Sequence, residues 1–422
     1  MTNHLQPIAP SQRVKEIDFV RGIALLGILM VNMAIFRNST FGMTIESPTS
    51  EGMLSTITNG ITYLFAEGKF YSLFSLLFGF GFSIFLLKEQ TQRIEMKPVF
   101  KRRMLGLLGF GMVHAFLIWS GDILITYALT GFLLMAFKDT SIKGLVKWAI
   151  GLVLFIILLQ VSIFGLVQLV KDTPNASIVM DQLGDSQNIM AKKAALAKEI
   201  YSGSNYGAMV VLRAKETVQQ LSGFIIVFPS VLAMFLIGFA LGKSGRLRNI
   251  SENKLFFKKM FWICLLLGLP LGAMHTYGLF VHSRTAIDMS GSFHVIGFFL
   301  GSPVLALAYF SGGLLLFNRF GKLKLFQMVA NAGRMALTNY LMQSIICTTL
   351  FYGYGFGLLG KVNAFYSLLL TLIIWSIQLP LSSWWLSRYR FGPAEWLWRW
   401  ITYGKKQQNR IKQELMVSEL PL

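Results

Sequence analysis

Charged residues are scarce in this sequence. Asp, Glu, Lys and Arg make up 14% of its 422 residues, whereas soluble proteins carry about 25%. The formal charge of +20 arises because 39 Lys and Arg face 19 Asp and Glu. In a soluble protein such an excess would indicate nucleic-acid binding. Here the basic residues lie in short linkers between apolar runs, a pattern that indicates a membrane protein and no nucleic-acid partner.

Cysteine is rare, and the motifs of several enzyme classes are missing. Cys264 and Cys347 are the two cysteines, and both lie in apolar runs whose order places them near opposite faces of a membrane. A disulfide between them is therefore not expected. The sequence has no P-loop, GxSxG elbow, HExxH or CxxC pattern. Nucleotide hydrolysis and redox chemistry consequently have no support from motifs.

Long apolar runs dominate the chain instead. Hydrophobic residues make up 54% of it, and its mean hydropathy is +0.57. Residues 104–137 are long enough for two crossings joined by a tight turn at Ser120 and Gly121. Gly79 and Gly81 in an earlier run are predicted to allow close helix packing. Single crossings are predicted for residues 19–36, 70–87, 145–170, 223–241, 257–280, 293–317, 327–351 and 362–386. We predict an all-α polytopic integral membrane protein with about ten transmembrane helices.

Polar segments divide the chain into five parts. The parts are a tail at 1–18, a membrane bundle at 19–170, an external helical segment at 171–222, a second bundle at 223–386 and a basic, Trp-rich tail at 387–422. Basic residues gather in the linkers 88–103, 138–147, 243–259 and 319–324, which fall on one side of the predicted membrane together with both termini. That side is predicted to be cytoplasmic.

The helical hairpin at 104–137 carries the strongest candidate for a catalytic site. His114 lies inside an apolar run, about 9 Å below the outer surface, and Tyr127 lies at a similar depth on the next helix. Ionisable groups that face lipid at this depth cost about 2.5–3.5 kcal/mol. We therefore expect the imidazole to face a cavity open to the outer side, with arginines at its inner opening.

Asp122 follows the turn of this hairpin and has two interpretations. In the first, His114 is a general base, Asp122 holds its tautomer and Tyr127 completes the catalytic group. In the second, the histidine only bonds to a neighbouring helix and Asp122 caps the helix that follows.

Three polar residues occupy the first predicted crossing. Asp18 and Arg21 are three residues apart on one helical face, so they are predicted to pair with each other or with linker charges, or Arg21 to bind a phosphate. The alternative for Arg21 is an anchor at the membrane surface. Asn32 lies deeper and needs a polar partner, with helix packing as its alternative role.

Further arginines lie near the same cytoplasmic side. Arg102 and Arg103 close a basic linker, and Arg334 lies near the start of a later crossing. Together with the arginines of the C-terminal tail they could hold an acidic ligand. The orientation rule for membrane proteins would produce the same charges without a ligand.

The outer side carries a second polar group around one short loop. It consists of His275, His282, Arg284, Asp288 and His294. Their spacing matches no standard zinc motif, so we expect no metal here. A polar mouth for an external substrate is the functional interpretation, and exposed loop residues are the alternative.

Five stretches of the sequence resemble one family of bacterial proteins. They are residues 16–33, 65–85, 111–131, 333–344 and 391–404. Together they are similar to the YeiB family, multi-pass proteins of the bacterial inner (plasma) membrane whose C-terminal half is a domain of unknown function. The resemblance therefore implies a fold and a location more than an activity.

The first stretch also resembles the heparan-α-glucosaminide N-acetyltransferases and, more weakly, the membrane acyltransferases that modify glycans. The shared pattern is Asp18, Arg21 followed by Gly, and Asn32. Those enzymes take an acyl group from cytoplasmic acyl-CoA and deliver it to a sugar across the membrane. The heparan enzymes carry their catalytic histidine in the loop after the first crossing, and residues 37–68 here contain none. His114 would then have to take that role.

Two functions follow from these observations. The first is a membrane acyltransferase that binds acyl-CoA with Arg21, Arg102 and Arg103 and serves a glycan or small polar acceptor at the outer face. The second is a transporter of a small solute, with His114 on a proton-coupled path. A non-catalytic sensor or assembly partner is a third option. The lipid bilayer is the expected partner, and a homo-oligomer stays open.

Overall fold

A computed structural model describes residues 14–92, 95–171, 173, 176–281 and 291–411. Within these ranges the chain is helical and forms no strand apart from an isolated bridge between Tyr389 and Arg410. The all-α prediction is therefore confirmed. The helices are α1 (Lys15–Ile45), α2 (Met53–Phe65), α3 (Lys69–Gln92), α4 (Lys97–Val113), the π-helix η2 (His114–Ile118), α5 (Leu124–Leu134), the 3-10 turn η3 (Met135–Phe137), α6 (Ile142–Lys171), α7 (Ala176–Ser202), α8 (Tyr206–Ser222), α9 (Phe224–Lys243), α10 (Lys254–Val281), α11 (Gly291–Phe320), α12 (Lys324–Arg334), α13 (Ala336–Phe351), α14 (Ala364–Arg388) and α15 (Pro393–Tyr403).

Among the described residues, seven helical segments are long and apolar enough to cross a membrane. They are α1, α2 with α3, α6, α9, α10, α11 and α14. The chain is therefore a multi-pass membrane protein. The other three predicted crossings correspond to shorter helices, because α4, α5 and α13 have 17, 11 and 16 residues. The predicted count of ten thus exceeds the number that length and composition support.

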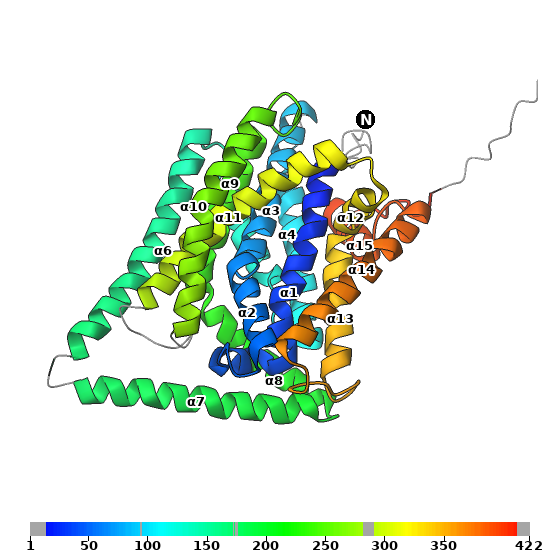
Figure 1. The fold of residues 1–422 in the computed structure, drawn as a ribbon. Helices are drawn as coiled ribbons and strands as arrows, with labels where there is room; N and C mark the ends of the chain where they lie inside the picture. The colour runs from blue at the N-terminus through cyan, green and yellow to red at the C-terminus, as the bar shows by residue number, and fades with distance from the viewer. Residues whose placement is uncertain (1–13, 93–94, 172, 174–175, 282–290, 412–422) are drawn as a thin grey trace, which may run out of the picture.

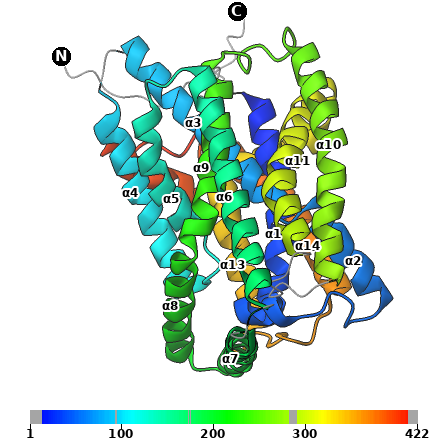
Figure 2. The ribbon, with the colours of Figure 1, turned by 90° about the vertical axis from the view of Figure 1, so that its left-hand side faces the viewer.

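The long helices stand side by side in one bundle (Figure 1). Helix α7 does not join it but lies across one end, and Figure 2 shows it end-on below the other helices. The start of α1 and the helices α12 and α15 lie toward the opposite end (Figure 1). The predicted external segment at 171–222 therefore contains α7 and α8, which cover one end of the bundle.

Helices α3 and α9 cross with their backbones in contact. A Cβ atom added to Gly79 would lie 1.9 Å from the carbonyl oxygen of Phe235, and one added to Gly238 would lie 1.8 Å from that of Leu76. Only glycine permits this approach, which confirms the packing role predicted for Gly79. The same prediction is wrong for Gly81, because no atom lies within 4 Å of its added Cβ.

We expect Gly79→Ala to destabilise the protein by about 1–3 kcal/mol, because the added methyl group must push two helix backbones apart. Gly151→Ala is the matched control, since Gly151 on α6 has open space around its added Cβ. The control should be neutral or stabilising by up to about 1 kcal/mol, because alanine favours helix more than glycine does. Thermal unfolding in detergent measures both changes, and equal effects would contradict the close crossing.

Candidate functional site

His114 lies where α4 changes into the π-helix η2. Its imidazole is fully buried, and both ring nitrogens have partners. Nδ1 lies 2.7 Å from Oδ2 of Asp122, and Nε2 lies 2.9 Å from Oγ of Ser344 on α13. Short π-helical segments occur frequently at functional sites. The contact between Nδ1 and Oδ2 confirms the predicted His114–Asp122 pair. The contact with Ser344 was not predicted.

Asp122 contacts the groups named in both interpretations, the imidazole and the start of the next helix. Its side chain is 1% exposed, and Oδ1 accepts a hydrogen bond from the backbone N–H of Ile125 at 2.8 Å. This bond caps the start of α5 while Oδ2 bonds to His114. A carboxylate that accepts the hydrogen bond at this contact leaves the proton on Nδ1 of the imidazole. Nε2 is then left to accept a hydrogen bond from the Ser344 hydroxyl.

Tyr127 does not join this group, contrary to the predicted meeting with His114. Its hydroxyl donates to the backbone oxygen of Tyr71 at 2.7 Å and lies 3.1 Å from Oγ of Ser75. The reason is that Tyr127 lies on the side of α5 that faces α3, while His114 faces α13.

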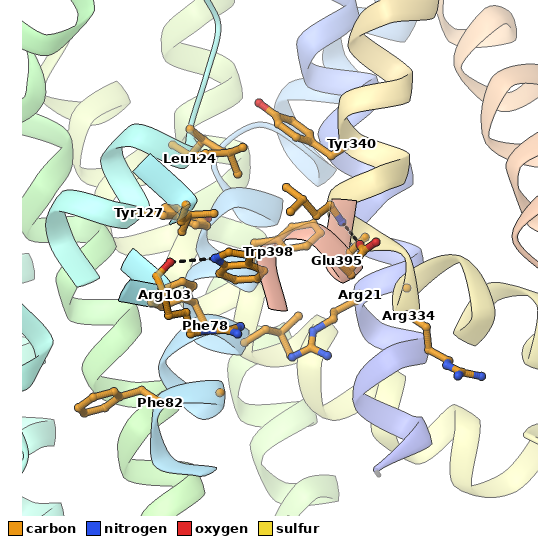
Figure 3. A pocket seen from close by; sticks show the side chains of 18 of the residues that line it. Arg21, Phe78, Phe82, Arg103, Leu124, Tyr127, Arg334, Tyr340, Glu395 and Trp398 are labelled. Atoms are coloured by element: carbon orange, nitrogen blue, oxygen red, sulfur yellow. Dashed lines mark hydrogen bonds between the residues drawn. The ribbon is translucent and has the colours of Figure 1, made fainter. Parts of the chain in front are cut away.

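A cavity of about 230 Å³ begins beside this group and extends toward the end of the bundle where α1 starts. Its walls come from α1, α3, α4, α5, α13, α15 and the end of α12. Aromatic side chains line much of it, namely Phe74, Phe78, Phe82, Phe85, Phe100, Tyr127, Tyr340 and Trp398. Figure 3 shows Tyr340 and Leu124 on one side of the cavity and Arg21 and Arg334 on the other.

Four arginines line this cavity: Arg21, Arg103, Arg334 and Arg399. Arg21 also forms the predicted pair with Asp18, at 3.1 Å between Nη1 and Oδ1. The guanidinium of Arg103 lies 3.7 Å from the ring centroid of Trp398. Sequence reasoning identified the first three of these, while Arg399 belonged only to the general group of tail arginines.

Two other predicted ligand-binding residues lie elsewhere. Arg102 is exposed and does not line the cavity, because neighbouring residues on α4 point in different directions. Asn32 is half-buried on α1 and does not line the cavity either. The arginine-lined cavity therefore includes Arg103 without Arg102, and Arg21 without Asn32.

The predicted outer mouth is described only in part. His282, Arg284 and Asp288 lie outside the described residues. The rings of His275 on α10 and His294 on α11 stack with centroids 4.6 Å apart, and Nε2 of His275 lies 3.8 Å from Oε2 of Glu67. In the part of the chain that the structure describes, no group of three or more His, Cys, Asp or Glu is placed to hold a metal ion.

The imidazole of His114 does not face the cavity, which corrects the expectation of direct contact. Tyr340 lines the cavity and also contacts His114, with the two ring centroids 5.0 Å apart. On the other side the site is covered by α8. The Ser120 hydroxyl donates to Oε2 of Glu216 at 2.5 Å, and Nη1 of Arg213 donates to the Leu117 oxygen at 2.7 Å.

Two carboxylates outside the crossings were missed by sequence reasoning: Glu216, which is buried, and Glu395, which is half-buried. Burial raises the pKa of Glu216, whose Oε2 also accepts a hydrogen bond from Tyr201 at 2.6 Å. Burial likewise raises the pKa of Glu395, which lines the cavity. Glu395 accepts hydrogen bonds from Leu337 N at 2.7 Å and from Thr338 N at 3.1 Å. No local motif marks either residue. The partners of Glu395 lie at least 57 residues away, and those of Glu216 lie 96 residues away or on another helix.

The fold and the site together define a multi-pass helical membrane protein with an arginine-lined cavity next to a buried His–Asp pair. The chain belongs to the YeiB family, which confirms the resemblance seen in the sequence. It is 30% identical over 415 residues to "Uncharacterized protein YeiB" of Escherichia coli, covering 93% of this chain and 96% of the relative.

Other relatives agree with this assignment. The chain is 33% identical over 411 residues to "Uncharacterized protein YxaH" of Bacillus subtilis, covering 94% of this chain and 96% of the relative. It is 29% identical over 412 residues to an "Uncharacterized 39.9 kDa protein in amylase 3'region" of Bacillus acidopullulyticus, covering 97% and 99%. Residues 241–405 match the family described as "Protein of unknown function (DUF418)". No solved structure matches the chain.

We expect Glu216→Gln to remove a loss of stability that the wild-type protein shows as the pH rises. Below the ordinary pKa of 4.5 the carboxyl is protonated in both the folded and the unfolded state. Between 4.5 and the raised pKa only the unfolded state ionises, so the folded state loses stability with increasing pH. Glutamine keeps an oxygen for Ser120 and Tyr201 but does not ionise.

Thermal unfolding of both proteins across this pH range measures the effect. The melting-temperature advantage of the Gln variant should grow as the pH rises. A difference that is independent of pH would contradict the burial of this carboxyl.

Proposed function

We propose that the protein is a membrane acyltransferase. It takes an acyl group from acyl-CoA at the cytoplasmic side and passes it to a hydroxyl or amine of a glycan or small polar acceptor at the outer face. The observation that carries this proposal is the cavity, which joins four arginines to an aromatic interior and ends one side chain away from the His114–Asp122 pair.

The proposed topology places this cavity across the inner half of a bacterial inner membrane. The shorter helices α4 with η2, α5 and α13 would cross together with the seven longer segments, which makes ten crossings with both termini in the cytoplasm. The basic linkers support this orientation. Arg21 near the start of α1 and Arg399 on α15 then lie at the cytoplasmic end, where acyl-CoA is present.

The chemistry of the cavity suits such a donor. Guanidinium groups bind phosphates with two parallel hydrogen bonds, and Arg103 is held in place by its stacking on Trp398. The aromatic walls beyond would hold the acyl group and the apolar parts of the pantetheine arm. A cavity of about 230 Å³ leaves the nucleotide at its mouth, beside the arginines.

The His114–Asp122 pair can supply general base catalysis. Nε2 of the imidazole can take a proton from a hydroxyl, and the Asp122 carboxylate stabilises the imidazolium that forms. The thiolate of CoA receives this proton when the thioester breaks. In this proposal Tyr340 moves aside for the donor carbonyl to reach the imidazole, because Tyr340 lines the cavity and contacts His114, whereas His114 does not line it.

We expect Arg103→Gln to weaken acyl-CoA binding about tenfold or more, because a charge-assisted hydrogen bond to phosphate contributes about 1.5–3 kcal/mol. Arg102→Gln is the matched control, since it removes the same charge one residue away but outside the cavity. Calorimetry or thermal shift with acetyl-CoA measures both. Absence of binding to the wild-type protein, with solute uptake into proteoliposomes, would contradict the proposal in favour of transport.

We expect His114→Ala to lower acyl transfer about 10²–10⁴-fold while acetyl-CoA still binds, because the base lies beyond the arginines that hold the donor. Transfer of a labelled acetyl group from acetyl-CoA to sugar acceptors, with the purified protein in liposomes, measures the rate. A variant that transfers at the wild-type rate would remove the catalytic role of His114.

A further inference from the structure

We propose that Ser344 is the nucleophile that carries the acyl group between donor and acceptor, so that transfer proceeds through an acyl-serine. This inference rests on the proposed acyl transfer and deepens it. Ser344 ends the stretch 333–344 that resembles the YeiB family, but that resemblance gave it no role; the geometry around His114 points to one.

Ser344, His114 and Asp122 form a continuous chain of hydrogen bonds. Oγ of Ser344 lies 2.9 Å from Nε2 of His114, and Nδ1 of His114 lies 2.7 Å from Oδ2 of Asp122. The three residues come from α13, from η2 and from the loop before α5, with 230 residues between the serine and the histidine. This is the arrangement in which a histidine activates a serine hydroxyl and a carboxylate holds the histidine.

The proton positions fit a nucleophile and its base. Asp122 uses Oδ1 for the Ile125 N–H and Oδ2 for the imidazole, so it fixes the proton on Nδ1. Nε2 then offers a lone pair to the Ser344 hydroxyl. The bond from the Ile125 N–H accounts for Oδ1 of Asp122, and Oδ2 is the oxygen that faces the imidazole. The carboxylate becomes useful when the histidine must accept a proton.

Ser344 also lies on the path that leads from the cavity. Leu337 and Tyr340 line the cavity, and Ser344 follows on the same face of α13, one helical turn or about 6 Å beyond Tyr340. Ser344 is 1% exposed and Tyr340 6% exposed, so the serine is sealed from water in this state. Tyr340 is therefore the side chain whose movement we expect to expose Ser344 to the cavity.

The reaction then has two balanced steps. In the first, Oγ of Ser344 attacks the thioester carbonyl while His114 takes the hydroxyl proton; the C–S bond breaks, and the departing sulfur takes that proton as free CoA thiol. In the second, an acceptor hydroxyl gives its proton to His114 and attacks the serine ester. The C–O bond to Ser344 breaks, and its oxygen recovers the proton from His114.

The test is to incubate the purified protein with labelled acetyl-CoA in the absence of acceptor. We expect an acetyl ester on Ser344, located by mass spectrometry and released by hydroxylamine, and chased onto a sugar acceptor when one is added. Ser344→Ala should lose both the ester and transfer. Thr348→Val is the matched control, because Thr348 is equally buried one turn further along α13, and its hydroxyl bonds only to the Ile345 oxygen.

Comparing Ser344→Ala with Ser344→Cys separates a chemical role of Ser344 from a structural one. Ser344→Cys keeps a nucleophile, so it should form an acyl thioester in place of the ester. The Ala, Cys and Val variants should unfold within a few degrees of the wild-type protein. Transfer by Ser344→Ala at more than about half the wild-type rate, or an acetyl group on another residue, would overturn the role of Ser344 and leave the acyltransferase intact.

A fluorophosphonate probe distinguishes this failure from failure of the proposed function. The probe reacts with activated serines and needs no acyl donor, and we expect it to label Ser344 in the wild-type protein and not in His114→Ala. Labelling of Ser344 without any transfer from acetyl-CoA would support Ser344 as an activated nucleophile and contradict acyl-CoA as the donor. Absence of both labelling and transfer would overturn the nucleophile and the acyltransferase together.

Discussion

The buried hydrogen bond between Asp122 and His114 constrains how η2, α5 and α13 pack together. A carboxylate removed from water needs compensation by hydrogen bonds, and removing one partner of a buried charged pair destabilises a protein by about 3–5 kcal/mol. Asp122 receives two such bonds, one from the imidazole and one from the start of α5. The tight turn of the hairpin and the π-helical end of α4 bring these groups together. Helix α13 must then approach closely enough for Ser344 to reach the second ring nitrogen.

The arginines of the cavity and the buried His114–Asp122 pair lie apart along the bundle. Guanidinium groups line the cavity toward the end where α1 starts, and the His114–Asp122 pair lies behind Tyr340 at its other end. The orientation of a membrane protein already requires basic residues on the cytoplasmic side. Four arginines from α1, α4, α12 and α15 line the cavity together with aromatic side chains.

Local sequence relations were predictable, and long-range ones were not. His114 and Asp122 are eight residues apart around one turn, and Asp18 and Arg21 are three apart on one helix, so spacing alone indicated both pairs. Ser344 lies 230 residues from His114, and Ser120 lies 96 from Glu216. No sequence pattern near these residues predicts their partners. Tyr127 was misplaced because depth in the membrane could be predicted, but the direction in which α5 faces depends on its packing against α3.

Glu395 has a consequence for the C-terminal segment of the chain. Its carboxylate on α15 holds the first turn of α13 through Leu337 and Thr338, and Trp398 from the same helix donates to the Arg103 oxygen at 2.8 Å. A truncation that ends the chain after α14 would remove one wall of the cavity and two of its polar residues. It would also uncap the helix that carries Ser344. The basic, Trp-rich tail is thus a structural part of the membrane domain, and a protein shortened in this way would lose contacts that hold α13 and α4 in place.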